Sequence, residues 1–368
     1  MFRIIFAAFL LCLAPGAASA DPASSEDLQE VVDRTRDDNG LIALGAVVAN
    51  ADGEILGLAV SGERVKGSGD AARPGDAWHI GSNTKMLTAL MYGRLVEQGR
   101  ASWGATLPEL FPDLAKEMDP AWQDVTVEQL LSHRSGLAAN PGMMWFLTAR
   151  GSKSSHADQR TALASSFLSK PPANTTGEFV YSNLGFMIAG AAIDRIAAEQ
   201  GYEDYEALFL ADFVPAGEGW GFGPPRVGIE GHSEGLFGGL KGQGKGPGAD
   251  NPPALAPAGT AHVPLAAHAR FISQFLRPDE TIAKLLTPVP DKSSDYALGI
   301  GMYDSAEHGR VYTHNGSNTM WLSSVTIAPE AGLVVIVNTN QFGKKDPAVL
   351  RSLTGELLEL YADAAEGE

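Results

Sequence analysis

Apolar and polar positions follow three different patterns along the chain. Near the N-terminal end, apolar residues recur at helical spacing over residues 26–36. Two apolar runs then follow at 41–50 and 54–61, joined by an Ala-Asp-Gly turn. These patterns predict an amphipathic helix and a β-hairpin.

Helical spacing dominates the middle of the chain, from about residue 78 to residue 200. The strongest signals are residues 82–98, 127–132 and 184–199. The next segment, 213–259, is rich in Gly and Pro and is expected to be one long surface excursion.

Strand-like runs return in the last third of the chain. A helix is predicted at 266–276 and a closing helix at 346–362, and the strand-like runs between them are 296–303, 310–314, 321–328 and 333–338. Strands thus lie at both ends of the sequence. We expect an α/β domain built from residues 21–77 and 265–368, interrupted by a mainly helical domain at 78–264.

The first twenty residues have the pattern of a secretory signal peptide. Arg3 precedes an apolar run at 4–13, and Ala18-Ser19-Ala20 offers a small-residue cleavage site. The run is too short to span a membrane, and no later apolar run is long enough. We therefore expect a periplasmic or secreted protein with no integral membrane span. The single cysteine, Cys12, would leave with residues 1–20, so no disulfide is expected.

Composition narrows the function classes further. Hydrophobic residues make up 44% of the chain and charged residues 19%, which is typical of a folded protein and not of a disordered one. The net charge of −17 argues against nucleic acid as a partner. The histidines show no metal-ligand spacing, so neither a metal site nor a cofactor is expected.

A Ser-x-x-Lys motif opens the helix predicted at 82–98. Residues three apart share a helix face, so Ser82 and Lys85 can meet. A desolvated lysine can take the proton of a serine and activate it as a nucleophile. Taken alone, the motif also fits a helix cap followed by a solvated lysine. However, Lys85 lies among apolar residues and is the only lysine of the chain with a serine three positions earlier.

Two further short motifs follow along the chain. Tyr181-Ser182-Asn183 precedes a predicted helix, and His314-Asn315-Gly316 ends a strand-like run. Each motif taken alone has an ordinary explanation. The first could be a core tyrosine with Asn183 as helix cap, and the second a plain turn. Gly316 would also let a ligand approach the backbone closely.

Together the three motifs, in this order, resemble those of the penicillin-recognising serine hydrolases. This family includes class C β-lactamases, D-alanyl-D-alanine carboxypeptidases and esterases of the same fold. Segments 125–137, 251–260, 296–299 and 328–330 also resemble family segments. The resemblance implies a β-lactamase/transpeptidase-like fold of the α/β plus all-α class. Its central antiparallel sheet is flanked by terminal helices, with a helical second domain.

The resemblance also implies the roles of the catalytic residues. Ser82 would be the acylated nucleophile, Lys85 would assist its deprotonation, and Tyr181 would pass a proton to the leaving group. Whether Lys85 or Tyr181 is the general base stays open from the sequence.

The substrate-binding residues follow by the same resemblance. Asn183 would bond the acyl side of the substrate and Lys85, and His314 would replace the lysine of a Lys-Thr-Gly triplet, with Gly316 after it. The backbone N–H groups of Ser82 and Ser317 would form an oxyanion hole.

The predicted function is therefore an exported serine hydrolase that needs no cofactor. Its substrate would be a small-molecule or peptide acyl compound: an ester, a D-amino-acid amide or peptide, or a β-lactam. Histidine is mostly neutral at pH 7, so His314 lowers the expectation of efficient antibiotic hydrolysis. A catalytically silent penicillin- or peptidoglycan-binding protein and an efficient class C β-lactamase stay open as alternatives. The oligomeric state is not assigned.

Two other signals carry less weight. Ser233 lies in a Gly-x-Ser-x-Gly pattern, but neither a strand before it nor a helix after it is predicted, so a loop turn is expected. Met320 and Trp321 follow the oxyanion position and would either shape an acyl pocket or belong to the strand core.

Overall fold

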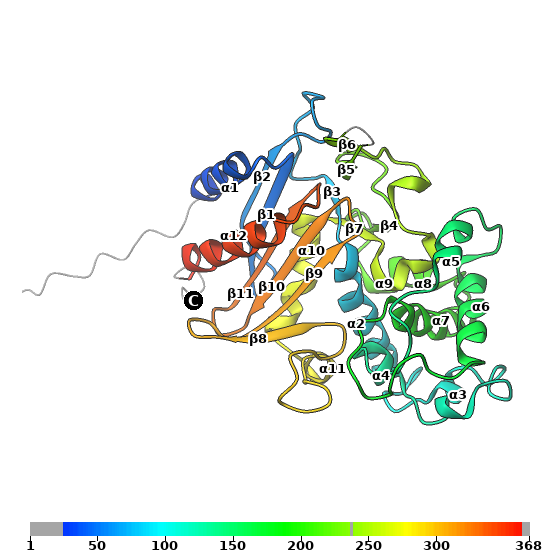
Figure 1. The fold of residues 1–368 in the computed structure, drawn as a ribbon. Helices are drawn as coiled ribbons and strands as arrows, with labels where there is room; N and C mark the ends of the chain where they lie inside the picture. Colours follow the sequence, from blue (N-terminus) through cyan, green and yellow to red (C-terminus); the bar gives the residue numbers. More distant parts are fainter. Residues whose placement is uncertain (1–24, 236–237, 363–368) are drawn as a thin grey trace, which may run out of the picture.

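One antiparallel sheet forms the centre of the molecule, and both ends of the chain contribute strands to it (Figure 1). The structure is a computed structural model that describes residues 25–235 and 238–362. The signal peptide predicted at 1–20 lies outside the described residues. The strands run in the order β2 (Ile55–Gly62), β1 (Ala43–Asn50), β11 (Leu333–Thr339), β10 (Leu322–Ala328), β9 (Gly309–Ser317) and β8 (Gly301–Ser305).

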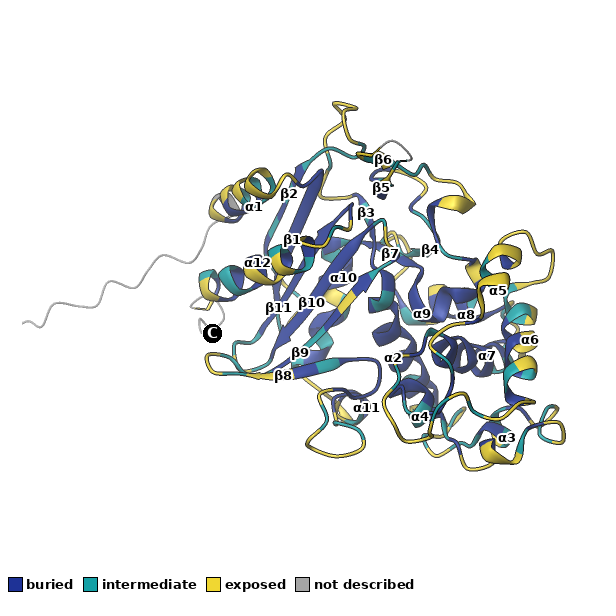
Figure 2. Ribbon diagram, viewed as in Figure 1, coloured by how far each residue is buried: buried dark blue, intermediate teal, exposed yellow. Residues whose placement is uncertain are grey.

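Both faces of this sheet are covered, which explains why the central strands β1, β11 and β10 are buried along nearly their whole length. Val47 and Ile336 point to one apolar cluster, whereas their neighbours Val48 and Val335 point to the other. Helices α1 (Ser25–Asn39) and α12 (Asp346–Leu360) pack on the second face, and α10 (Leu265–Ser273) lies behind the first. Strands buried on both faces lack the alternation of a half-exposed strand, and Figure 2 shows them buried throughout.

The remaining helices gather beside the sheet, with α2 and α7 at their centre (Figure 1). They are α2 (Thr84–Glu97), α3 (Leu107–Leu110), α4 (Val127–Leu131), α5 (Met143–Ala149), α6 (His156–Leu168), α7 (Asn183–Glu199), α8 (Tyr205–Leu208), α9 (Ala256–Gly259) and α11 (Glu280–Leu285). Short 3₁₀ turns cover Gly81–Asn83, Pro120–Trp122, Pro247–Ala249, Pro253–Leu255 and Gln274–Leu276, and a π turn covers Phe209–Phe213.

A small three-stranded sheet connects the two halves of the molecule. Its order is β3 (Ala77–His79), β7 (Ala261–Pro264) and β4 (Gly221–Phe222). The backbone N–H of Ile80 extends this pairing by donating to the carbonyl of Ala261 at 2.9 Å. This sheet therefore fixes the chain immediately before Ser82.

The Gly- and Pro-rich segment 213–259 is more ordered than a surface excursion. It contributes β4, the hairpin of β5 (His232–Glu234) and β6 (Leu240–Gly242), and the buried helix α9. The expectation of one long surface excursion was wrong, because residues such as Ile229 and Ala254 are buried and give the segment its own apolar anchors.

The strand predicted at 296–303 is only partly present. Residues 297–300 form a buried tight turn, in which the N–H of Ala297 donates to the carbonyl of Ile300, and β8 begins at Gly301. Gly299 has a φ of +77°, and its N–H donates to the carbonyl of Leu131. The apolar run was therefore a turn packed under helices α2 and α4, which periodicity cannot distinguish from a short buried strand.

The antiparallel sheet, the terminal helices and the helical second half expected from the sequence are all present. The domain boundaries at 77/78 and 264/265 stay a prediction. Within the described ranges, no helix is both long and apolar enough to cross a membrane.

Candidate active site

Ser82 lies in a tight turn between strand β3 and helix α2. The turn covers Gly81–Asn83, and α2 begins at Thr84, two residues later than the sequence predicted. Thr84 supports the turn by donating its hydroxyl to the carbonyl of Gly81 at 2.6 Å. The 3₁₀ turn keeps Ser82 and Lys85 on one side, so that Lys85 Nζ lies 3.2 Å from Ser82 Oγ.

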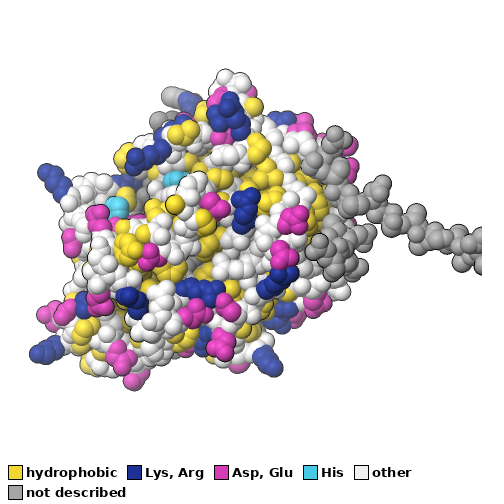
Figure 3. All heavy atoms as spheres, turned by 180° about the vertical axis from the view of Figure 1, so that it is seen from behind, with side chains coloured by type: hydrophobic (Ala, Val, Ile, Leu, Met, Phe, Trp, Pro, Cys, Tyr) yellow, Lys and Arg dark blue, Asp and Glu magenta, His cyan; other side chains and the backbone are white. Residues whose placement is uncertain are grey.

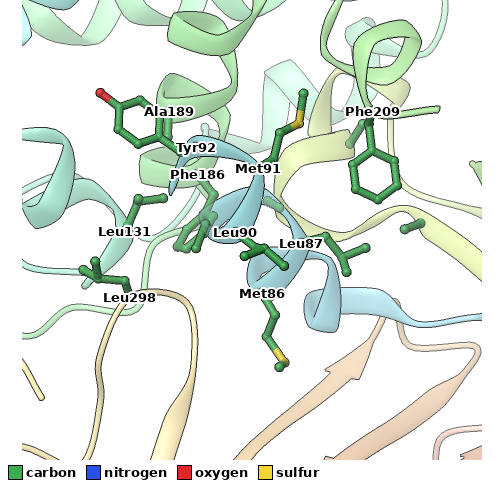
Figure 4. Close-up of a cluster of buried hydrophobic side chains, with 14 of the residues drawn as sticks. Met86, Leu87, Leu90, Met91, Tyr92, Leu131, Phe186, Ala189, Phe209 and Leu298 are labelled. Atoms are coloured by element: carbon green, nitrogen blue, oxygen red, sulfur yellow. The ribbon is translucent and has the colours of Figure 1, made fainter. Parts of the chain in front are cut away.

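Lys85 is completely buried, although its side chain ends in an amine. Nζ donates to Asn183 Oδ1 at 2.7 Å and to the carbonyl oxygen of Ala258 at 2.6 Å. Apolar side chains of α2 and its neighbours, Phe186 among them, surround this part of the helix (Figure 4). Burial lowers the pKa of Lys85 well below its ordinary value.

These contacts determine which neighbours accept the protons of a neutral Lys85 amine and which one faces its lone pair. A neutral amine carries two N–H protons and one lone pair. If Asn183 and Ala258 accept the two protons, the lone pair is left for Ser82 Oγ, the third neighbour. In that state the arrangement directs the lone pair of Lys85 Nζ toward the hydroxyl of Ser82.

Tyr181 lies next to Ser82 and Lys85, in the loop before helix α7. Its phenol is hydrogen-bonded to Ser82, and its ring centroid is 4.8 Å from Lys85 Nζ. The residue exposes 37% of its surface, yet burial of the phenol group raises its pKa to about 12, an effect that the bond with Ser82 reduces in part. The phenol therefore keeps its proton at neutral pH.

Asn183 is the first residue of α7 and joins Lys85 to the loop before α5. Its Oδ1 accepts from Lys85, and its Nδ2 donates to Asn140 Oδ1 at 2.7 Å. Ser182, not Asn183, caps the helix, because Ser182 Oγ accepts from the N–H of Gly185 at 2.9 Å. The alternative reading of Asn183 as a helix cap was wrong.

Strand β9 approaches the turn of Ser82 through two glycines. A Cβ on Gly316 would lie 1.9 Å from the carbonyl oxygen of Ile80 and 2.8 Å from the nitrogen of Ser82. A Cβ on Gly81 would lie 2.3 Å from the nitrogen of Ser317. The space at Gly316 is therefore filled by the protein's own turn, and not by a ligand as the sequence suggested. The close packing brings the nitrogens of Ser82 and Ser317, the predicted oxyanion donors, to one junction.

His314 is only 6% exposed, and other side chains occupy both of its ring nitrogens. Nδ1 lies 3.2 Å from Asn83 Oδ1, and Nε2 lies 3.3 Å from the hydroxyl of Tyr296. Burial is the main reason that the pKa of His314 is lowered to about 3. The site therefore holds a neutral imidazole where the resemblance implied a substitute for a lysine.

Sequence reasoning missed a buried support beneath the Ser82 turn. His79 accepts from the N–H of Gly81 at 3.1 Å and contacts Asp250 Oδ2 at 2.8 Å. The other carboxylate oxygen of Asp250 accepts from Asn318 Nδ2 at 2.9 Å. Asp250 thus joins the nucleophile turn to the loop after Ser317. No local pattern pointed to it, because its partners lie far from it in the sequence.

Two secondary signals of the sequence are resolved by their surroundings. Ser233 lies in strand β5 and pairs with Lys241 of β6, so it belongs neither to a strand–helix elbow nor to a loop turn. Trp321 is 1% exposed and packs edge-on against Trp78, at 6.2 Å between ring centroids. It is a core residue, and the reading of Trp321 as the wall of an acyl pocket was wrong.

One group among the described residues has the donor set of a metal site. Ligand atoms of His156, Asp204 and Glu206 lie within 4.8 Å of one another, beside a cavity of 780 Å³ that Ser82 does not line. However, the buried Arg160 already pairs with Glu206 at 2.7 Å and with Asp194. The group is therefore an ion-pair network. Its members are up to fifty residues apart, so residue spacing could not reveal it.

Comparison with known proteins agrees with this geometry. The sequence profile of the Beta-lactamase family matches residues 28–359. Esterase EstB of Burkholderia gladioli is 34% identical over 145 residues, which are 38% of this chain and 35% of the esterase. The chain thus spans about a third of the length of this curated relative.

Solved structures with the same fold cover nearly the whole chain. SurE superposes with a TM-score of 0.72 at 20% identity, covering 91% of this chain and 76% of SurE. The D-amino acid amidase from Ochrobactrum anthropi SV3, complexed with L-phenylalanine amide, superposes with a TM-score of 0.69 at 19% identity. The match covers 92% of this chain and 99% of the amidase. At these identities the likeness establishes the fold.

Proposed function

The chain belongs to the Beta-lactamase family, and from this premise we propose that it is a serine acyl-hydrolase with Ser82 as its nucleophile. The observation that carries the proposal is the fully buried Lys85, whose Nζ lies 3.2 Å from Ser82 Oγ. A buried lysine without a carboxylate partner is costly unless it is neutral, and a neutral amine is a base.

The proposed reaction begins with Lys85 as the general base. Its lone pair takes the proton of Ser82 while Oγ forms a bond to the acyl carbon of the substrate. The carbonyl oxygen becomes an oxyanion, which the N–H groups of Ser82 and Ser317 stabilise. Each such donor is worth about 10²–10³ in rate.

Tyr181 acts as the proton donor in this proposal, because its raised pKa, about 12, keeps the phenol protonated. As the tetrahedral intermediate collapses, the bond to the leaving group breaks and Tyr181 gives that group a proton. The protonated Lys85 then restores the proton of Tyr181. A water molecule attacks the acyl-enzyme in the second half, and the same two residues return the proton to Ser82.

We propose small esters and D-amino-acid amides without a carboxylate as the preferred substrates. The neutral His314 offers no fixed cation at the position that the resemblance assigns to the lysine of a Lys-Thr-Gly triplet. The similarity to an esterase and to a D-amino acid amidase supports the same choice.

Hydrolysis of p-nitrophenyl acetate by wild type and Ser82→Ala tests the proposal. The substitution removes the nucleophile, so turnover should fall by about a thousandfold or more while the circular dichroism spectrum is unchanged. The matched control is Ser233→Ala, which should retain full activity because Ser233 lies in a separate hairpin. Unchanged turnover in a folded Ser82→Ala variant would contradict the assignment.

A fluorescent penicillin distinguishes the silent binding protein from the enzyme. Covalent labelling of wild type that requires Ser82, without turnover of any ester or amide, would favour the binding protein over the hydrolase.

A further inference from the structure

A chain of buried hydrogen bonds runs behind the proposed catalytic residues and links all three sequence motifs. We propose that His133 and Tyr296 are positioning residues that fix the tautomer of His314. Through His314 they hold Asn83, the residue next to the proposed nucleophile. The kinetic consequences of this inference rest on the proposed function, whereas the tautomers themselves do not.

The chain begins at a backbone group whose role is unambiguous. The N–H of Ser182, between Tyr181 and Asn183, donates to His133 Nδ1 at 3.0 Å. A backbone N–H can only donate, so His133 Nδ1 carries no proton. His133 is 1% exposed, and burial lowers its pKa well below the ordinary value. The neutral ring therefore carries its single proton on Nε2.

Tyr296 accepts a hydrogen bond from this N–H group and donates its own hydroxyl proton to His314. His133 Nε2 lies 3.1 Å from the hydroxyl oxygen of Tyr296, so the imidazole donates and the phenol oxygen accepts. The hydroxyl proton of Tyr296 then points to His314 Nε2, 3.3 Å away. Tyr296 lies at the start of the buried turn before β8.

The direction at His314 follows from the previous link. Its Nε2 accepts, and the ring is neutral, so its proton is on Nδ1 and is donated to Asn83 Oδ1 at 3.2 Å. The amide of Asn83 then donates to Ser323 Oγ on β10 at 2.8 Å. Asn83 and Ser323 are completely buried, so water cannot replace either bond.

The opposite tautomer of His314 would lose both of its hydrogen bonds, to Tyr296 and to Asn83. Its Nε2–H would face the proton of Tyr296, and its bare Nδ1 would face the carbonyl oxygen of Asn83. The ionisable groups around His314 are Lys85 on α2, Tyr181 before α7, Tyr296 before β8 and His133 after α4. None is a carboxylate that would favour an imidazolium, so the neutral Nδ1–H form is the one that fits.

Nuclear magnetic resonance of ¹⁵N-histidine-labelled protein tests the tautomers directly. Long-range ¹H–¹⁵N spectra should show His133 protonated on Nε2 and His314 protonated on Nδ1, with neither signal titrating between about pH 5 and 8. The signals are assigned with His133→Gln and His314→Gln. A His314 ring protonated on Nε2, or one that titrates in this range, would overturn the proposal.

The tautomers do not depend on turnover, so the spectra of the inactive Ser82→Ala variant should show the same two tautomers as wild type. Wild type without any turnover would remove the proposed function, yet the two tautomers would still be observed. Conversely, an active enzyme with the opposite His314 tautomer would remove only the positioning chain.

Tyr296→Phe tests the positioning role, because it deletes one hydroxyl and with it two bonds. We expect kcat for p-nitrophenyl acetate to fall about tenfold with KM nearly unchanged, as the loss of two modest hydrogen bonds implies. The signal of His314 should move at the same time. The matched control is Tyr303→Phe on β8, which is 49% exposed and should change neither value. A Tyr296→Phe variant with normal kcat and an unmoved His314 signal would contradict the proposal.

Discussion

At the scale of single residues, the site depends on small distances that only a few side chains permit. Gly316 is the sharpest case, because any Cβ there would overlap the backbone of Ile80 at 1.9 Å. Backbone atoms cannot give way as the end of a flexible side chain can. The glycine of the His-x-Gly motif is therefore required for packing between β9 and the Ser82 turn.

Gly316→Ala should consequently impair both stability and activity. The added methyl group would push β9 away from the turn, which typically costs about 1–3 kcal/mol of the free energy of unfolding. It would also separate the nitrogens of Ser82 and Ser317, so kcat for an ester should fall by about a hundredfold if the oxyanion site is lost. Urea denaturation and ester kinetics measure the two effects.

Gly355→Ala is the control with the opposite sign. Gly355 lies in helix α12, and a Cβ there would meet nothing within 4 Å. Alanine is a better helix former, so the variant should gain about 0.5–1 kcal/mol and keep full activity. Equal effects of both substitutions would show that the close contact at Gly316 is unimportant.

At the scale of elements, one buried arginine holds three helices together. Arg160 on α6 is completely buried and forms two hydrogen bonds of 2.7 Å to Asp194 on α7. It also donates to Glu206 on α8 at 2.7 Å. Burial alone would raise the pKa of Glu206, but the charge of Arg160 and the hydrogen bonds from Arg160 and His156 lower it to about 2.

Arg160→Met should therefore destabilise the protein strongly. Removing the cation leaves the buried carboxylate of Asp194 without its ion pair and Glu206 with the hydrogen bond to His156, and breaking such a buried pair typically costs about 3–5 kcal/mol of unfolding free energy. Chemical denaturation at pH 7 measures this loss. The control Arg195→Met, on α7, removes a pair with the exposed Asp113 and should cost less than about 1 kcal/mol.

The same network predicts a pH dependence with a definite sign. The pKa of Glu206 is lower in the folded state, about 2, than its ordinary 4.5, so its stabilisation is complete above pH 4.5 and is lost as the pH falls toward 2. In Arg160→Met this part of the acid unfolding curve should flatten. A variant that loses stability over the same pH window as wild type would contradict the role of Arg160.

At the scale of the whole molecule, the face seen in Figure 3 shows charged side chains spread over its surface and not gathered into one patch. The net charge is −17, yet on the face seen in Figure 3 the basic side chains stand among the acidic ones. We therefore expect the selectivity among acyl substrates to be set by the side chains of the proposed site. At this site His314 is neutral, so it offers no permanent positive charge to a substrate.

We accordingly predict that wild type hydrolyses p-nitrophenyl acetate with a higher kcat/KM than nitrocefin. A charge-assisted hydrogen bond to a carboxylate contributes about 1.5–3 kcal/mol, so its absence should weaken nitrocefin hydrolysis by roughly ten- to a hundredfold. Steady-state kinetics with both substrates measure the ratio. A preference for nitrocefin by orders of magnitude would instead identify an efficient β-lactamase.

The sequence by itself determined the elements and the chemical candidates. The pattern of apolar residues predicted helices α2 and α7 and strands β1 and β11. Such a pattern is a local property of the chain, since a helix or a strand repeats within a few residues. The Ser-x-x-Lys spacing likewise placed Ser82 and Lys85 together, because three residues make almost one helical turn.

Only the tertiary structure decided how these parts act on one another. The burial that lowers the pKa of Lys85 comes from α7 and α9. The ring nitrogens of His314 contact Tyr296 and Asn83, and Asn83 lies more than two hundred residues earlier in the chain. The turn at Gly299 and the true place of Trp321 were also invisible in the apolar pattern, because a buried turn, a buried strand and a pocket wall use the same residue types. Burial, pKa and hydrogen-bond direction depend on groups distant in sequence, so they arise only when the chain is folded.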